Sequence, residues 1–563
     1  MIKAYQKLLG VALLLGVHSF ANAETNQTYL EQNWTQQDRE YFYFADQGSR
    51  LVPYNFFLHL EQANQNQLFR SDANMLRFGA IPIKKSQENP DGLPIGFTRN
   101  KDKVGLTCAA CHTQQIRYQN KTTMIDGGQP FLDLQKLLSE LTLSMQATLD
   151  DDNKFNRFQA GILGARASHH KKTALRQALK NEYKKRITYQ QDNATEVRYG
   201  YGRLDAFGAI LNRALVATGV PNNTNPPNAP TSYPYLWDTP QHDYVEWNGA
   251  QSNSNIGAFA RNIGEVIGVF GDITPDTQRW LGLIDGGYPS SIQAAELRKI
   301  EKVVSKLHSP LWPEHFPKID TKLAQQGRVL YEQHCLACHV DIKRTDPKRM
   351  IQVRMTTLDN IQTDPAMARN AILNTGKSGT LEGQPRYYVT GDPLPKVAPA
   401  IDIANNIMVG VIKNNPLQAY LAGKDANSFG HGDEIHPSKY VNGKVIAKGE
   451  EVSQTALLAY KARPLNGVWS SAPFLHNGSV PNLYQLLLPA KERVKQYYLG
   501  SLEFDAKQVG FEMTKNEDSF LFDTTLQGNS NAGHEYGTGG GYENLPALTE
   551  AERWALIEYL KTL

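Results

Sequence analysis

Two short strings of the sequence decide its fold, Cys108-Ala109-Ala110-Cys111-His112 and Cys335-Leu336-Ala337-Cys338-His339. Both read C-x-x-C-H, and together they contain all 4 cysteines of the 563-residue chain. This spacing is a signature of c-type haem attachment, in which both thiols bond covalently to one haem. The histidine that follows the second cysteine is then an axial ligand of the iron. The strings therefore predict two covalently bound haem c groups.

Two other sites use the same spacing between cysteines, a redox dithiol and a zinc site. A dithiol of the thioredoxin kind would need a βαβ context, which neither flank of the two strings supplies. A zinc site with four cysteines would not need His112 and His339. Covalent haem is therefore the favoured interpretation.

The first 23 residues have the pattern of a secretory signal peptide. Lys3 and Lys7 precede an apolar stretch from Leu8 to Val17, and Ala21-Asn22-Ala23 fits an A-x-A cleavage site. The apolar stretch is too short to span a bilayer comfortably, and no later segment has the sequence of a transmembrane anchor. We expect a mature chain that begins near Glu24 and is periplasmic or secreted.

The length of the chain allows two large domains, because a single core stops growing at roughly 250 to 300 residues. We expect an N-terminal haem lobe over residues 24–300, with a Pro- and Asn-rich loop at 221–240, and a C-terminal cytochrome c-like lobe over 301–563. The net charge of +3 and the pI near 8.4 are close to balanced. Charge therefore does not indicate a nucleic-acid partner or an anionic membrane.

Helical patterns are stronger than strand patterns along the chain. An amphipathic run from Leu323 to Tyr331 leads into the second haem string, and Thr549 and Glu552 form a capping box before a further helical pattern. Asp133 is expected to cap another helix. Strand signals are short and scattered. The sequence therefore predicts a mainly α fold with extensive loops, few short strands and two cytochrome c-like haem lobes.

The second axial ligand of each iron decides what the haems can do. An iron with two protein ligands passes electrons, whereas an iron with an open face can bind oxygen or peroxide. His534 is the strongest candidate, because the glycine-rich stretch around it lets the backbone approach a flat ring. His476 is the next candidate, and the methionines are further alternatives.

The two haem strings, the stretch from Trp469 to Ser479 and the late Gly533-His534-Glu535-Tyr536-Gly537 together resemble the di-haem cytochrome c peroxidase superfamily. Within it they are most similar to the rubber oxygenase-like branch, which contains di-haem dioxygenases. The resemblance covers most of the mature chain. Peroxidases of the wider superfamily commonly use methionine on the closed iron, so His534 is the feature that favours the oxygenase branch.

This resemblance implies an asymmetric pair of haems. His112 would hold an N-terminal haem with an open face, whereas His339 and His534 would together hold the C-terminal haem. A tryptophan commonly relays electrons between the haems of this superfamily, and Trp237 is our candidate for the relay. The alternative is that Trp237 and Trp247 are packing aromatics. Bound calcium is a further possibility that the sequence leaves open.

The chain is therefore predicted to be a haem-dependent oxidoreductase, a dioxygenase that uses O₂ to attack the C=C bond of an unsaturated hydrocarbon or acyl chain. One alternative is a peroxidase that reduces H₂O₂ with electrons from a small donor protein such as a cytochrome. A peroxidase needs a distal acid–base group, for which Glu246, Glu265 and His242 are candidates. The other alternative is an electron-transfer protein with two closed haems and no enzyme activity.

Overall fold

The computed structural model describes residues 27–276, 279–280, 284–428, 440–441, 444–445, 458–539 and 545–563. The predicted signal peptide, residues 1–23, lies outside these residues. Helices account for 39% of the structure and strands for 15%, and the strands form many small sheets. The fold is therefore mixed α/β, and the prediction of few strands is wrong. Most of the strands are too short for an alternating pattern to be recognised in the sequence.

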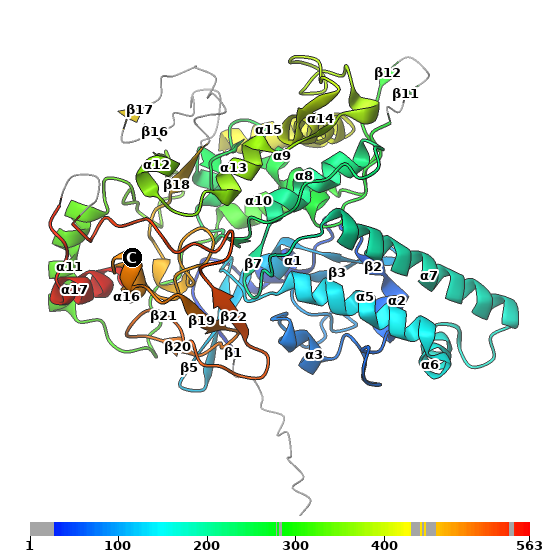
Figure 1. Cartoon of the computed structure of the whole chain (residues 1–563), viewed down its shortest axis with the longest axis horizontal. Coiled ribbons are helices and arrows are strands. Elements are labelled where there is room, and N and C mark those ends of the chain that lie inside the picture. Colours follow the sequence, from blue (N-terminus) through cyan, green and yellow to red (C-terminus); the bar gives the residue numbers. More distant parts are fainter. Residues whose placement is uncertain are drawn as a thin grey trace, which may run out of the picture.

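The N-terminal part of the chain combines two small sheets with a helical arm. Its elements are β1 (Gln27–Tyr29), α1 (Gln36–Phe44), β2 (Val52–Pro53), α2 (Tyr54–His59), α3 (Asp72–Arg77), β3 (Phe97–Asn100), β4 (Lys103–Leu106), α4 (Cys108–Cys111), β5 (Thr113–Tyr118), β6 (Lys121–Asp126), α5 (Leu134–Asp150), α6 (Asp152–Leu163) and α7 (His169–Asp192). Helices α5, α6 and α7 pack on one another and extend to one end of the molecule (Figure 1). Asp133 accepts a hydrogen bond from Lys136 N at 2.9 Å and caps α5 as predicted.

The middle of the chain forms a layer of helices with short strands between them. Its elements are β7 (Arg203–Leu204), α8 (Ala206–Ala217), β8 (Thr231–Ser232), β9 (Tyr244–Val245), β10 (Gln251–Ser252), α9 (Gly257–Gly268), β11 (Arg279–Trp280), β12 (Ile284–Asp285), α10 (Ala294–Ser305), α11 (Thr321–His334), β13 (Arg354–Thr357), α12 (Leu358–Ile361), α13 (Ala366–Leu373), β14 (Thr375–Lys377), β15 (Val397–Pro399), α14 (Ala400–Lys413), α15 (Pro416–Ser428), β16 (Tyr440–Val441) and β17 (Lys444–Val445). Helices α8, α9 and α14 enclose one hydrophobic core.

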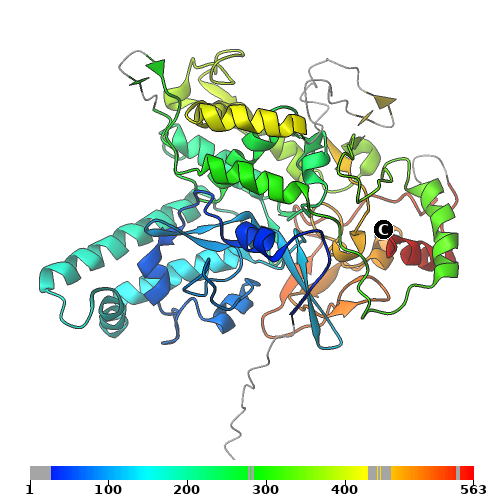
Figure 2. The ribbon, with the colours of Figure 1, turned by 180° about the vertical axis from the view of Figure 1, so that it is seen from behind.

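The C-terminal part of the chain packs near the second haem string, because its last helix contacts the helix that precedes the string. Its elements are β18 (Ala459–Ala462), α16 (Leu483–Leu486), β19 (Gln496–Leu499), β20 (Phe504–Asp505), β21 (Gly510–Phe511), β22 (Phe520–Asp523) and α17 (Glu550–Leu560). The predicted capping box is present at the start of α17. Helices α11 and α17 cross at the end of the molecule opposite the helical arm (Figure 2). Their backbones come so close that a Cβ on Gly327 would lie 2.0 Å from the Ala555 oxygen, which only glycine allows.

The expected division into two lobes stays a prediction. The largest hydrophobic cluster contains residues from both ends of the chain, such as Trp34 and Leu556, and α10 runs through residue 300. The Pro- and Asn-rich segment 221–240 is largely loop, as predicted, and it passes through the interior of the molecule. Among the described residues, no helix combines the length and the apolar composition that crossing a bilayer requires.

Candidate cofactor pockets

The first C-x-x-C-H string forms one helical turn between two strands. Thr107 caps α4 by accepting a hydrogen bond from Ala109 N, and β5 begins directly after His112. The cysteine side chains and the His112 ring consequently line the same pocket. Neither cysteine forms a disulfide, and burial raises the pKa of the Cys111 thiol to about 12.

His112 has the protonation state of a metal-ligating histidine. Its Nδ1 lies 2.8 Å from the carbonyl oxygen of Pro234. A carbonyl only accepts, so Nδ1 carries the proton and Nε2 keeps its lone pair. Burial lowers the pKa of His112 to about 4, and the ring is therefore neutral at physiological pH. A hydrogen bond of this kind fixes the orientation of an imidazole toward a metal.

The second string lies at the C-terminal end of α11. Cys335 ends that helix, and Cys335, Cys338 and His339 line a second pocket. The Nδ1 of His339 donates to the carbonyl oxygen of Arg463 at 2.6 Å. Burial lowers the pKa of His339 as well. The proximal histidines of the two strings therefore have the same tautomer and the same kind of partner.

His534 faces His339 across this second pocket. The centroids of the two rings are 6.2 Å apart, and their planes are inclined by 54°. Two imidazoles that bind one metal from opposite sides, at a metal–nitrogen distance of ~2.0–2.1 Å, have their centroids roughly 6 Å apart. Burial lowers the pKa of His534 to about 3, so this ring is neutral too. The pair can therefore accept a single metal ion between its rings.

Local backbone geometry holds His534 in that position. Gly533 has a φ of 75° and His534 a φ of 54°, both in the left-handed region. A Cβ on Gly533 would lie 2.3 Å from the carbonyl oxygen of Ile361, so the chain passes directly against α12. The backbone N–H of His534 donates to the same oxygen at 2.9 Å. The glycine before His534 is thus required by a close approach of two backbones.

His476, the other predicted ligand, also lines the second pocket. Its ring stacks on Tyr460 at 4.0 Å and lies 6.4 Å from Trp247. Its ring partners therefore differ from those of His534, which are His339 and Tyr536.

Four residues line both pockets and so lie between them: Pro234, Trp247, Lys461 and Arg463. Trp237 lines neither pocket. It is fully buried, donates from Nε1 to Asn466 O at 2.9 Å and stacks on Tyr235 at 4.3 Å. The relay role of Trp237 stays a prediction, while Trp247 is the tryptophan in contact with both cavities.

The first pocket contains a cluster of ionisable groups. Glu246 and Glu265, two of the predicted acid–base candidates, line it together with Arg261, Glu301 and Lys461, whereas His242 does not. Burial raises the pKa of Glu265 to about 7, although Arg261 lies 3.7 Å away. The Glu265 side chain is 41% exposed, and because it lines the pocket this exposure is toward the cavity.

The other members of this cluster are arranged around Arg261. Its guanidinium donates to Glu301 at 2.6 Å and to Asn253 at 3.0 Å. Burial lowers the pKa of Lys461 far below its usual range and raises the pKa of Glu246. Glu265, with its pKa of about 7, can therefore exchange a proton near neutral pH, which is the property of a general acid or base.

Both pockets have the size and the lining for a large flat cofactor. The space free of protein atoms, including its open side, is about 1440 Å³ in the first pocket and about 1290 Å³ in the second. Within the described part of the chain, seven buried polar atoms of the two linings have no hydrogen-bond partner, namely Gln47 Nε2, Ser232 Oγ, Tyr233 Oη, Glu301 Oε1, Thr363 Oγ1, Arg463 Nε and Ser471 Oγ. Paired cysteines, a neutral histidine and polar atoms available for carboxylates fit a haem c.

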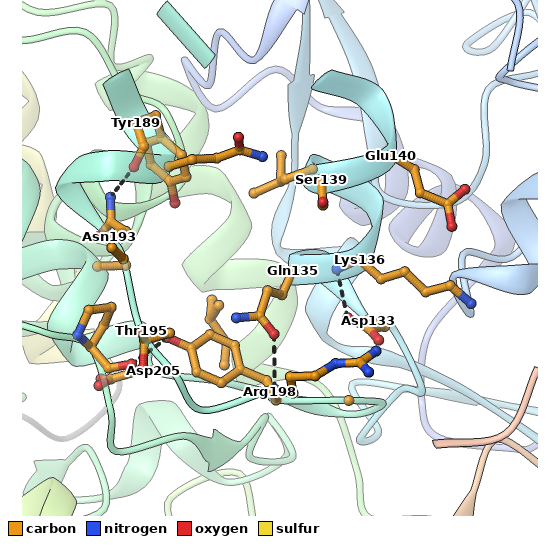
Figure 3. Close-up of a pocket in the computed structure, with 18 residues that line it drawn as sticks. Asp133, Gln135, Lys136, Ser139, Glu140, Tyr189, Asn193, Thr195, Arg198 and Asp205 are labelled. Atoms are coloured by element: carbon orange, nitrogen blue, oxygen red, sulfur yellow. Dashed lines mark hydrogen bonds between the residues drawn. The ribbon is translucent and has the colours of Figure 1, made fainter. Parts of the chain in front are cut away.

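A third pocket adjoins the first (Figure 3). It lies between α5, α7 and the segment before β7. Polar side chains, among them Lys136 and Arg198, line it. Leu204 and Ala209 line both this pocket and the one that contains His112. The two pockets are therefore adjacent. No group of three or more His, Cys, Asp or Glu side chains suited to a metal ion occurs in the described ranges, and calcium binding stays an open prediction.

Comparison with known proteins places the chain in a family. It is 30% identical to the uncharacterized protein y4iJ of Sinorhizobium fredii, over 95% of this chain and 93% of the relative. The chain belongs to the family of y4iJ. A second uncharacterized protein of the same organism, y4iM, is 27% identical over 62% of the chain and 70% of its own length.

A family model described as RoxA-like, cytochrome c-like matches residues 459–498. This segment begins with β18, supplies Lys461 and Arg463 between the pockets and contains His476. A cytochrome c-like domain is typical of haem proteins, so the match supports a haem protein independently of the cysteine strings. Sequence reasoning missed the roles of Lys461 and Arg463, because no motif marks them.

Proposed function

We propose that the protein is an exported di-haem c-type oxidoreductase in which one haem is attached in each pocket and the reaction takes place in the first. The difference between the two pockets carries this proposal. His339 has His534 opposite it, whereas the described lining of the first pocket includes no second histidine and no methionine. A haem bound at His112 would supply an iron with a vacant position for a small oxidant.

The favoured reaction is a dioxygenation of an unsaturated apolar chain. Phe207, Ile210 and Val266 give the first pocket apolar walls that would hold such a chain and exclude water. We propose that the chain enters from the third pocket, which shares Leu204 and Ala209 with the first. The RoxA-like match and the pairing of His339 with His534 support this reaction over the alternatives.

Oxygen consumption tests the dioxygenase. The purified protein is incubated with O₂ and either oleic acid or polyisoprene, without a reductant, and oxygen uptake and oxygenated products are measured. We expect uptake with at least one substrate and incorporation of both atoms of ¹⁸O₂. Uptake that requires an added electron donor would count against a dioxygenase.

The carboxylate cluster favours reduction of peroxide as a second candidate. Reducing H₂O₂ to two molecules of water consumes two protons and two electrons, and the protons must be delivered at the reaction site. Glu265 lies in the first pocket and has a pKa of about 7, so it can hold and release a proton there. A reduced small cytochrome would supply the electrons. Donor oxidation that depends on H₂O₂, without oxygen uptake, would favour this reaction.

An electron carrier with two closed haems is the remaining alternative. Carbon monoxide binds only an iron with a free or weakly held position, so it distinguishes an enzyme from a carrier. We expect one of the two reduced haems to bind CO. Two low-spin haems that both ignore CO would contradict the proposed reaction site.

Export and haem number are tested on the same material. The proposal predicts a periplasmic or secreted protein that begins near Glu24 and carries the mass of two haems. Replacing Cys108 and Cys111 by Ala should remove one haem, and replacing Cys335 and Cys338 should remove the other. Mass spectrometry and pyridine haemochrome absorbance measure both results.

The relay between the pockets can be assigned by comparing two tryptophans. Trp247 is in contact with both cavities, whereas Trp237 lies behind Tyr235. We therefore expect Trp247→Phe to slow electron transfer between the haems more than Trp237→Phe does. The opposite order would support the sequence-based choice of Trp237.

A further inference from the structure

A continuous chain of covalent and hydrogen bonds joins the two proximal histidines. His112 donates to the Pro234 carbonyl at 2.8 Å, and the next residue, Tyr235, accepts at its own carbonyl from the Arg463 guanidinium at 2.9 Å. The carbonyl of Arg463 in turn accepts from His339 at 2.6 Å. Arg463 thus contacts one histidine through its backbone and reaches the segment that holds the other through its side chain.

The side chain of Arg463 is rigidly held. Its guanidinium carbon lies 3.6 Å from the centroid of the Tyr235 ring, and Trp237 stacks on that ring with planes inclined by 12°. The Tyr235 hydroxyl donates to Pro464 O at 2.7 Å. Arg463 is only 6% exposed. Loss of the guanidinium would therefore remove a stacked layer as well as a hydrogen bond.

Arg463 also brings a buried positive charge between the pockets. Its hydrogen bonds go to carbonyl and hydroxyl oxygens, and within the described residues it forms no salt bridge. The guanidinium stays protonated in proteins. Asp238 attracts the guanidinium, but this carboxylate already forms a salt bridge with Arg349 at 2.5 Å. A buried cation acts over a longer distance than a surface cation, because little water screens it. It would favour the reduced state of any iron nearby.

We infer that Arg463 is a positioning residue that couples the two redox centres, because it ties the supports of His112 and His339 together and holds a positive charge between them. This inference rests on the proposed presence of two haems. The step it assists is the transfer of one electron from the haem at His339, which is oxidised, to the haem at His112, which is reduced, with no bond made or broken.

The test uses the holoprotein with three substitutions. Arg463→Gln removes the charge and the planar guanidinium, Arg463→Lys keeps the charge but loses the stacked planar group, and Arg166→Gln is the control. Arg166 carries the same charge but is exposed and lines neither pocket. The Arg463 carbonyl that accepts from His339 is retained in all variants.

The readouts are the midpoint potential of each haem by spectroelectrochemical titration and the rate of electron transfer between the haems after flash photolysis of CO. We expect Arg463→Gln to disfavour reduction of both haems by about tenfold, which equals ~59 mV for a one-electron couple, and to slow the transfer. Arg463→Lys should restore the potentials but leave the transfer slow. Arg166→Gln should leave the transfer rate and both potentials close to wild type.

Unchanged potentials and an unchanged transfer rate in Arg463→Gln, with both haems attached, would overturn the inference. If that variant does not retain both haems, the Arg463→Lys variant tests the inference instead. A wild-type transfer rate in that variant would refute the role of the planar guanidinium. Failure of the proposed function gives a different result. A wild-type protein in which neither haem binds CO lacks the reaction site, but its two potentials still report on Arg463.

Discussion

Replacement of Glu265 by Gln should abolish the pH dependence of any peroxide reaction in the first pocket. Burial raises the pKa of Glu265 to about 7, against the attraction of Arg261 and together with repulsion from Glu246 and Glu301. Glutamine keeps the size and the hydrogen-bonding capacity of the side chain but cannot release a proton. The substitution therefore isolates proton transfer from packing.

The magnitude follows from the position of that pKa. For a carboxyl group with a pKa of about 7, roughly nine tenths of the molecules are protonated at pH 6 and roughly one tenth at pH 8. A step that needs the protonated acid should therefore slow about tenfold between these values. In Glu265→Gln the rate should be low and nearly flat over the same range. A general acid typically contributes ~100-fold or more, so we expect a loss of that order at pH 6.

The assay measures oxidation of a reduced cytochrome donor by H₂O₂ between pH 5.5 and 8.5, under single-turnover conditions. Glu88→Gln, a substitution of an exposed glutamate, is the control and should behave as wild type. The same pH series of O₂ uptake with an unsaturated acyl chain should be flat, because dioxygenation consumes no protons. If the rate of donor oxidation in Glu265→Gln still changed near pH 7, the assignment of this carboxyl would be refuted.

Three further predictions concern ligation, access and stability. His534→Ala should leave both haems attached but convert one low-spin haem to high spin, measured by its absorption and electron paramagnetic resonance spectra, because the ring opposite His339 is lost. Ala209→Leu should narrow the passage shared by the first and third pockets, lowering kcat/KM for a long unsaturated chain more than for H₂O₂. Arg203→Met should lower the free energy of unfolding in urea by about 3–5 kcal/mol, because buried Arg203 donates to Tyr199, Asn477 and Asn529.

Each of these predictions has a matched control. His476→Ala should leave the spin state unchanged, and a spin change there but not in His534→Ala would reverse the ligand assignment. Leu76→Ala changes an exposed apolar residue and should not affect substrate access. Arg166→Met, at an exposed position, should change stability by at most ~0.5 kcal/mol. Equal losses in Arg203→Met and Arg166→Met would show that the Arg203 hydrogen bonds contribute little.

Local patterns predicted the local structure well. Asp133 caps α5, the Thr549 and Glu552 box begins α17, and the run before Cys335 is helical. These features depend on residues within one or two turns of each other, so the sequence around them contains the information. The small sheets were missed because their strands pair over few residues, and short pairings leave no period that can be recognised.

The candidate site divides in the same way. Two thiols and a histidine lie within five residues of each other in each string, so their spacing alone predicted that they line one pocket together. His534 was a candidate because of the glycines around it, but only the path of the chain past α12 decided that its ring faces His339. The thiols and the histidine of each string are therefore encoded locally, whereas the histidine that faces His339 is determined by the fold.

Tertiary structure alone determines which residues lie between the pockets. Arg463 follows β18 and Pro234 lies in a loop, and no spacing relates the two to each other or to the haem strings. They meet because packing of distant segments brings their carbonyls to His112 and His339. Sequence periodicity reports which face of a single element is buried, but it does not report which distant elements share a cavity. The sequence by itself thus determined the two Cys–His groups that we propose as attachment points, while the fold decided how their pockets differ and what lies between them.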